Sequence, residues 1–188
     1  MAEQPVTMVP AIIVITGAMA AGKSTVAQLL AERLPRAAHV RGDFFRRMIV
    51  SGQAPMSDPL SDEAAAQLRL RHQLAARTAE GYATAGIAAV VQDIILGLDL
   101  LRFLRMLQHR PVHVVVLAPD AATLARRDAA RSKTGYVGWT PDGFDRELRD
   151  ATPRLGLWLD TSRQTPDQTV ETILNRLADA LVDQPADE

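Results

Sequence analysis

Cysteine is absent from the 188-residue sequence. Its absence excludes disulfide bonds, thiolate nucleophiles and zinc sites built on cysteine, and it fits a reducing compartment. No stretch reaches the ~20 consecutive apolar residues that a membrane-spanning helix needs. The N-terminal segment also lacks the basic start of an export signal. We therefore expect a cytoplasmic protein with no membrane partner.

A large excess of charge of one sign is also missing, because the formal net charge is −1 at pH 7. Proteins that bind nucleic acid over a broad surface usually carry a strong positive charge, so nucleic acid is not the expected partner. The four histidines show no metal-ligand spacing, and the few tyrosines and tryptophans form no base-stacking platform. Apolar residues make up 47% of the chain, which predicts a folded globular protein.

Short apolar segments alternate with helix-length amphipathic segments along the chain. This alternation predicts a three-layer α/β/α sandwich around a five-stranded parallel sheet. We expect a single domain with its core at about 11–182 and disordered ends. The strands are predicted at 11–16, 37–41, 87–92, 112–117 and 156–160. The helices are predicted at 23–34, 44–50, 61–83, 98–107, 120–131, shortly after Pro141, and at 169–182.

One glycine-rich motif lies directly after the first predicted strand and opens the first predicted helix, as a phosphate-binding loop must. Gly17 and Gly22 lack a Cβ atom, so the backbone can turn tightly and its N–H groups can approach phosphate. We expect Lys23 to reach the β- and γ-phosphates, Ser24 to join the Mg²⁺ shell and Thr25 to bond the α-phosphate. An ordinary turn would not require these residue types in this register. The motif reads Gly17-Ala18-Met19-Ala20-Ala21-Gly22-Lys23-Ser24.

An aspartate follows the second and the third predicted strand. Ligands of open parallel sheets bind beyond the carboxyl ends of the strands, so Asp43 and Asp93 should both face the nucleotide. Asp43 is the candidate base that orients the acceptor hydroxyl and takes its proton, and its alternative role is a helix N-cap. Asp93 ends an apolar strand like a Walker-B aspartate, so it would bind Mg²⁺ through water or hold the acceptor. The two roles could be exchanged.

Arginines gather in two places. Arg127 and Arg131 are four residues apart and share a helix face, just before a glycine-containing segment. Residues 127–140 are therefore expected to form a lid whose guanidinium groups stabilise the transferred phosphoryl group. Arg46 and Arg47 follow the first candidate aspartate and would contact an anionic acceptor. For both pairs the alternative is a solvated helix face.

In this order, the phosphate loop, the strand-end aspartates and the arginine lid resemble the chloramphenicol phosphotransferase-like small-molecule kinases. These kinases are P-loop proteins related to the zeta-toxin-like and nucleoside monophosphate kinase-like groups. The resemblance covers about residues 11–182. It is carried by GAMAAGKST, VRGDFF, VVQDIILG, ARRDAARSKTGY and LDTSRQTPDQTVETIL.

The resemblance implies the P-loop kinase fold with ATP and Mg²⁺ as cofactors. It implies that Asp43 is the base on the acceptor hydroxyl and that Asp93 lies in the acceptor site. It further implies that Arg127 packs near adenine, that Arg131 reaches the phosphates and that residues 161–164 lie close to adenine. It does not identify the acceptor.

Together these features predict a kinase that moves the γ-phosphoryl group of ATP to a hydroxyl of a small molecule, such as an antibiotic or a sugar. One alternative is a nucleotide or nucleotide-sugar kinase, in which Arg46 and Arg47 bind the acceptor phosphate. Another is a switch protein that hydrolyses ATP slowly and binds a partner. A GTPase is disfavoured because no N-K-x-D segment is present. The sequence leaves a monomer and a homodimer equally open.

Overall fold

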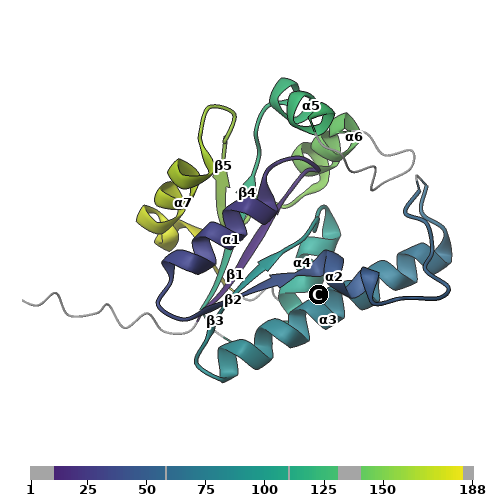
Figure 1. The fold of residues 1–188 in the computed structure, drawn as a ribbon, viewed down its shortest axis with the longest axis horizontal. Coiled ribbons are helices and arrows are strands. Elements are labelled where there is room, and N and C mark those ends of the chain that lie inside the picture. The colour runs from purple at the N-terminus through teal and green to yellow at the C-terminus, as the bar shows by residue number, and fades with distance from the viewer. Residues whose placement is uncertain (1–10, 58, 110, 131–140, 184–188) are drawn as a thin grey trace, which may run out of the picture.

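The computed structural model of the protein describes residues 11–57, 59–109, 111–130 and 141–183 (Figure 1). The predicted lid falls only partly within them, since Arg127 is described whereas Arg131 and the segment after it lie outside. The chain ends that were predicted to be disordered also lie outside. In the part that is described, no helix combines the length and the apolarity needed to cross a bilayer.

A twisted sheet forms the middle layer, and five of its strands run parallel in the order β2–β3–β1–β4–β5. Every residue of β1, β3 and β4 is buried, as expected for strands that are covered on both faces and are rich in apolar and β-branched residues. The predicted five-stranded parallel sheet is therefore confirmed. The strands are β1 (Ile12–Gly17), β2 (Ala37–Arg41), β3 (Ala88–Gln92), β4 (Val112–Leu117) and β5 (Leu157–Leu159).

A sixth strand was not predicted. β6 (Leu181–Val182) runs antiparallel to the first residues of β4, whose edge β5 leaves uncovered. The terminal helix predicted over 169–182 is wrong in both bounds, because α7 spans Pro166–Asn175 and a 3₁₀ turn at Leu177–Ala180 leads into β6. β6 thus completes this edge of the sheet.

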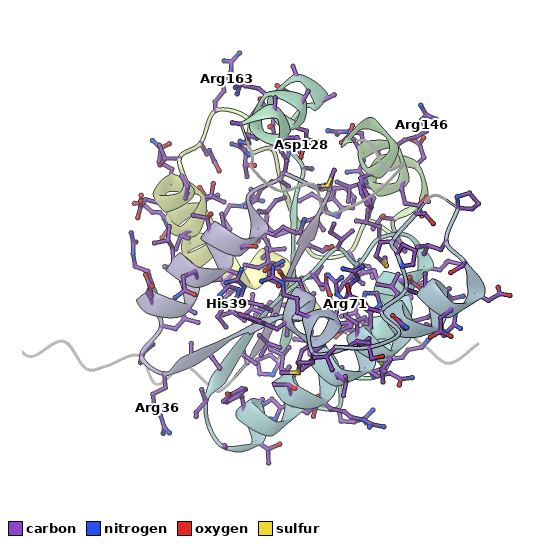
Figure 2. The ribbon with its side chains drawn as sticks, turned by 45° about the vertical axis from the view of Figure 1, so that its right-hand side comes forward. Arg36, His39, Arg71, Asp128, Arg146 and Arg163 are labelled. Carbon is purple, nitrogen blue, oxygen red and sulfur yellow. The ribbon has the colours of Figure 1, made fainter. Side chains whose placement is uncertain are left out.

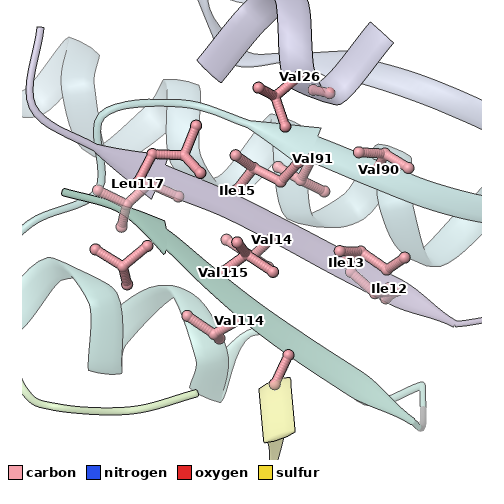
Figure 3. Packing of buried hydrophobic residues seen from close by; sticks show 14 of the residues in the cluster. Ile12, Ile13, Val14, Ile15, Val26, Val90, Val91, Val114, Val115 and Leu117 are labelled. Atoms are coloured by element: carbon pink, nitrogen blue, oxygen red, sulfur yellow. The ribbon is translucent and has the colours of Figure 1, made fainter. Parts of the chain in front are cut away.

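Helices cover both faces of this sheet (Figure 1). α1 and α7 pack against each other on one side, whereas α3 and α4 lie together on the other. Figure 3 shows the core between these layers, where side chains from the three central strands meet Val26 of α1. The helices are α1 (Lys23–Arg33), α2 (Gly42–Arg47), α3 (Asp62–Thr84), α4 (Leu98–Arg105), α5 (Ala121–Ala129), α6 (Pro141–Arg146) and a π-helical turn at Glu147–Ala151.

Two helices begin at side-chain caps, which are the first residues of the helices predicted over 61–83 and 120–131. The Ser61 hydroxyl accepts a hydrogen bond from the Ala64 N–H group at 3.1 Å and starts α3. The Asp120 carboxylate accepts one from Thr123 N–H at 2.6 Å and starts α5. Each cap satisfies a backbone donor that the first helical turn leaves without a partner.

The short helix α2 begins two residues earlier than the N-cap role of Asp43 would require. Asp43 lies inside the first turn of α2, and the N-cap position is Arg41, whose side chain makes no capping bond. The alternative role of Asp43 as an N-cap is therefore wrong. The helix predicted over 44–50 also ends sooner, at Arg47. The Asp43 carboxylate is consequently available for contacts outside its own backbone.

Candidate nucleotide and acceptor site

The loop between β1 and α1 has the geometry of a phosphate-binding turn. Gly17 has φ +143°, and a Cβ atom at this position would overlap the carbonyl oxygen of Leu117 on β4. Gly22 has φ +94° and occupies the N-cap of α1 in the left-handed region, which glycine adopts at little cost. The sequence motif therefore folds as predicted, with strand, tight turn and helix in succession.

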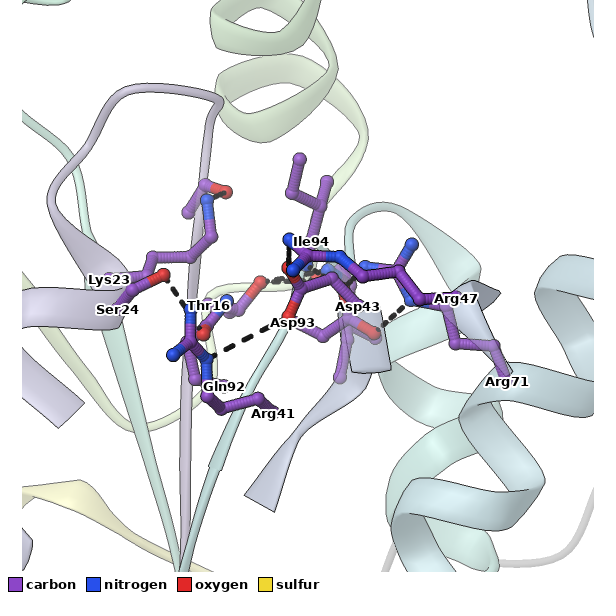
Figure 4. Close-up of polar contacts among 12 residues, drawn as sticks. Thr16, Lys23, Ser24, Arg41, Asp43, Arg47, Arg71, Gln92, Asp93 and Ile94 are labelled. Atoms are coloured by element: carbon purple, nitrogen blue, oxygen red, sulfur yellow. Dashed lines mark hydrogen bonds and ion pairs between the residues drawn. The ribbon is translucent and has the colours of Figure 1, made fainter. Parts of the chain in front are cut away.

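Lys23 lies across this loop (Figure 4). Its ammonium group donates to the carbonyl oxygens of Gly17 at 3.0 Å and Ala18 at 2.7 Å. The residue is only 7% exposed. These bonds hold a positive charge inside the concave side of the loop, where the helix N-terminus also favours an anion. The position suits a lysine that binds the terminal phosphates of a nucleotide.

The hydroxyl of Ser24 bonds to Gln92, a residue that was not predicted from the sequence to belong to the site. Ser24 Oγ donates to Gln92 Oε1 at 3.0 Å, and Gln92 is a buried residue at the carboxyl end of β3. The residue in contact with the predicted Mg²⁺ ligand is thus Gln92 and not its neighbour Asp93. The available signal was its position, since Gln92 ends an otherwise apolar strand at the ligand-binding edge of the sheet.

Asp93 is fully buried and forms a bidentate ion pair with Arg71 of α3 (Figure 4). Arg71 Nε donates to Asp93 Oδ2 at 2.6 Å, and Arg71 Nη2 pairs with Oδ1. The Ile94 N–H group donates to Oδ1 at 2.7 Å. A Cβ atom at Gly42 would overlap this carboxylate, so only glycine at the start of α2 lets the pair sit against it.

Arg71 was also missed, although the sequence held a signal. It shares the buried face of α3 with His72, Ala75 and Ala79, at helical spacing. An arginine in register with buried alanines requires a partner of opposite charge. Figure 2 shows Arg71 inside the molecule, whereas Arg36, Arg146 and Arg163 point outward.

The Asp43 side chain is 34% exposed and faces two arginines. Arg47 Nη2 lies 2.6 Å from Asp43 Oδ2, one helical turn further along α2. Arg41 Nε lies 3.8 Å from Asp43 Oδ1. The carboxylate of the candidate base is therefore fixed by Arg47 on one oxygen, and its other oxygen faces Arg41.

Arg127 joins three segments at the opposite end of the site. Its Nη1 donates to the carbonyl oxygen of Ala21 at 3.3 Å, and its Nη2 donates to that of Thr161 at 3.0 Å. The guanidinium group thereby ties α5 to the phosphate loop and to the turn between β5 and α7. Its predicted role near adenine stays a prediction.

The phosphate loop, Asp43, Asp93 and Arg127 line one cavity of about 840 Å³. This volume is in the range of small-molecule sites, which is ~300–1,000 Å³. The end of the cavity beside Arg127 is formed by the turn between β5 and α7 and the start of α7, and the other end by α2, α3 and the end of β3. The sequence-predicted residues that line it are Met19, Ala20, Ala21, Gly22, Lys23, Ser24, Thr25, Asp43, Arg46, Arg47, Asp93, Arg127, Thr161 and Gln164.

The described residues contain no group of three or more His, Cys, Asp or Glu side chains that could hold a metal ion on their own. Mg²⁺ is commonly bound by one or two protein oxygens together with substrate phosphates. The Ser24 hydroxyl and the Gln92 amide oxygen line the cavity beside the phosphate loop and fit that requirement. The protein is thus suited to Mg²⁺ that arrives with a nucleotide.

Three histidines are partly or fully buried and have lowered pKa values. Burial, with a smaller contribution from Arg41, lowers the pKa of His39 to about 4. Burial also lowers the pKa of His72, which stacks edge-on against Phe103, and of His113. These side chains are neutral at physiological pH, and none of the three lines the cavity.

A phosphate loop on the central strand of a parallel sheet ordered β2–β3–β1–β4–β5 defines a protein of the P-loop kinase fold. The chain belongs to the AAA_33 family, described as an AAA domain, whose profile matches residues 12–153. No curated protein sequence matches the chain.

Several solved structures share the fold. A sugar kinase from Janibacter superposes with a TM-score of 0.68 at 22% identity and covers 91% of this chain and 96% of its own. The tunicamycin resistance protein of Deinococcus radiodurans has a TM-score of 0.64 at 16% identity, covering 93% and 99%. A gluconokinase from Sinorhizobium meliloti has a TM-score of 0.61 at 21% identity, covering 90% and 93%.

Proposed function

We propose that the protein is a cytoplasmic ATP-dependent kinase that phosphorylates a hydroxyl group of a small molecule. One observation carries the proposal: the phosphate loop and the Asp43 carboxylate line the same cavity, which is large enough for a nucleotide and a small acceptor. A kinase needs this pairing, because phosphoryl transfer depends on placing a hydroxyl in line with the γ-phosphate. The names of the similar structures, which include a sugar kinase and a gluconokinase, agree with it.

On the nucleotide side, the loop N–H groups and Lys23 bind the β- and γ-phosphates. Ser24 and Gln92 would hold Mg²⁺, which would offset the negative charge that spreads over the transferred group. Thr25 bonds the α-phosphate. Arg127 lies beside the adenine. Arg131, outside the described residues, reaches the phosphates in this proposal.

On the acceptor side, Asp43 accepts a hydrogen bond from the reacting hydroxyl and takes its proton as the hydroxyl oxygen bonds to the γ-phosphorus and the bond from that phosphorus to ADP breaks. Arg47 fixes the orientation of this carboxylate through its bond of 2.6 Å. Asp93 has both oxygens on Arg71. We therefore assign Asp93 to the acceptor half, where it positions Arg71, and assign the metal to Ser24 with Gln92.

The test is acceptor-stimulated release of ADP, measured over a panel of alcohols. We expect Asp43→Asn to lower the turnover rate by ~10²–10⁴-fold, the usual contribution of a positioned acid–base group, while Mg·ATP still binds. Asp179→Asn changes an exposed aspartate that does not line the cavity and serves as the matched control. Unchanged turnover in the Asp43 variant would exclude it as the base. ATP hydrolysis that no acceptor stimulates would instead support a switch protein.

A further inference from the structure

The acceptor half of the cavity carries more positive than negative side chains. We define it by the lining residues contributed by α2, the loop after α2, α3 and the end of β3, together with Arg41. Among these residues are four arginines and two aspartates, so the surplus is two positive charges. The lining residues are Arg41, Asp43, Arg46, Arg47, Met56, Arg71, Gln92, Asp93 and Ile94.

Two of the arginines have a carboxylate partner at hydrogen-bond distance. Arg71 is paired with Asp93, where both carboxylate oxygens are used. Arg47 is paired with Asp43 at 2.6 Å. These pairs account for both aspartates of the acceptor half.

Arg46 has no carboxylate partner among the described residues. Its Nη2 donates to the Ala54 carbonyl oxygen at 3.1 Å, while its Nε is buried and makes no hydrogen bond there. The Arg46 backbone oxygen accepts a bond of 2.7 Å from Gln53, and Gln67 of α3 bonds the Ala54 N–H group at 2.9 Å. The bond from its guanidinium group to Ala54 therefore anchors the Arg46 side chain to the loop after α2.

Arg41 is the second arginine in surplus. Its Nε lies 3.8 Å from the nearest Asp43 oxygen, which is beyond hydrogen-bond distance, and this buried atom has no hydrogen-bond partner in the described chain. Its guanidinium group stacks over the Phe44 ring at 5.0 Å. Arg41 also lines a smaller hollow together with Ser24 and Thr25, so it lies between the phosphate loop and the candidate base (Figure 4).

A guanidinium charge that lines a cavity without a carboxylate at hydrogen-bond distance is left uncompensated, and an anionic ligand in that cavity compensates it. The planar guanidinium group matches the two oxygens of a carboxylate or phosphate better than it matches a single hydroxyl. Two anchored guanidinium groups beside the base therefore form a receptor for an anion. A neutral sugar or antibiotic would leave these two positive charges without compensation.

We propose that the acceptor is an anion, whose carboxylate or phosphate group is bound by Arg41 and Arg46 while its hydroxyl lies at Asp43. This inference rests on the proposed function, because it assigns the acceptor class of that kinase. It makes Arg46 a specificity-determining residue that binds a group remote from the reacting oxygen. Phosphorylated and carboxylated acceptors share this chemistry, and the experiment below separates them.

The experiment measures binding of inorganic phosphate and of malonate to the protein saturated with Mg²⁺ and the non-hydrolysable ATP analogue AMP-PCP. The nucleotide occupies the phosphate loop, so any further anion must bind elsewhere. Affinities are read from the shift in melting temperature at constant ionic strength, with chloride as the compensating salt, because a ligand that binds only the folded state raises it. The variants are Arg46→Gln, the double variant Arg41→Gln/Arg46→Gln, and the control Arg77→Gln, an exposed arginine of α3 that does not line the cavity.

We expect at least one anion to raise the melting temperature of the wild type. Its affinity should fall about tenfold in Arg46→Gln, the usual effect of losing one hydrogen bond to a charged group, and further in the double variant. The control should keep the wild-type response. A larger response to phosphate assigns a phosphorylated acceptor, and a larger response to malonate assigns a carboxylated one. No response in the wild type, or an undiminished response in the double variant, overturns the proposal.

Failure of the proposed function would appear separately, as absence of AMP-PCP binding in the first step. The anion titration is then repeated on nucleotide-free protein carrying Lys23→Ala, which weakens phosphate binding at the loop. Dependence of anion binding on Arg41 and Arg46 would support the anion site even there, and independence would overturn it.

Discussion

Asp93→Asn removes the negative charge from the buried pair while nearly preserving shape. Asp93 is fully buried and Arg71 is 5% exposed, so the positive charge of Arg71 would remain in the interior without its carboxylate. Breaking one partner of a buried ion pair costs ~3–5 kcal/mol of unfolding free energy. For a chain of this size, each kcal/mol lowers the melting temperature by ~2–4 °C, so we expect a fall of roughly 6–20 °C.

The assay is urea unfolding followed by far-ultraviolet circular dichroism. Asp179→Asn removes an exposed ion-pair partner and should change the unfolding free energy by less than ~1 kcal/mol. The double variant Arg71→Met/Asp93→Leu leaves no isolated charge, so it should be more stable than Asp93→Asn. A loss in Asp93→Asn no larger than that of the Asp179 control would refute the importance of the pair.

The same variant separates two roles for Asp93. At a temperature where it remains folded, Asp93→Asn should keep the wild-type dependence of turnover on Mg²⁺ concentration, because we assign the metal to Ser24 and Gln92. A shift of that dependence by about tenfold or more, equivalent to ~1.4 kcal/mol, would make Asp93 a metal-binding residue instead.

Three further predictions follow from individual contacts. Gln92→Leu removes the acceptor of the Ser24 hydroxyl, and we expect about a tenfold loss in turnover with a higher Mg²⁺ requirement, measured by ADP release; wild-type values would argue against this contact. Arg127→Ala deletes the bonds to Ala21 and Thr161 and should weaken ATP binding about tenfold by calorimetry, whereas equal affinity would dissociate Arg127 from the nucleotide. The three histidines described above have folded pKa values below the unfolded value of 6.5, so the unfolded chain binds more protons under acidic conditions. Urea unfolding should therefore show stability falling as the pH drops from about 6.5 toward 4, and a flat profile would contradict the burial of these rings.

The parallel strands could be predicted because burial on both faces leaves a simple pattern. Ile12–Gly17 and Val112–Leu117 are almost entirely apolar runs, with Thr16 and His113 as their polar members, and each is followed by residues that leave the sheet. The strand Leu181–Val182 was not predictable in this way, because two residues carry no period and their pairing depends on an edge formed far away in the sequence.

The phosphate loop and Asp43 could be predicted from the sequence because each follows a predicted strand. The partners of these residues could not. Gln92 and Arg71 act through contacts across 68 and 22 residues of chain, which only the folded structure brings together. Capping was predictable at Ser61, yet Asp43 falls inside α2, because that helix starts at a glycine that fits against a buried carboxylate.

The most direct test of the account is calorimetric titration of Mg·ATP into the folded wild-type protein and into Lys23→Ala. We expect one binding site per chain in the wild type and a severe loss of affinity in the variant, because the ammonium group lies inside the loop that receives the phosphates. Absence of binding to the wild type, or equal affinity in both proteins, would contradict the account.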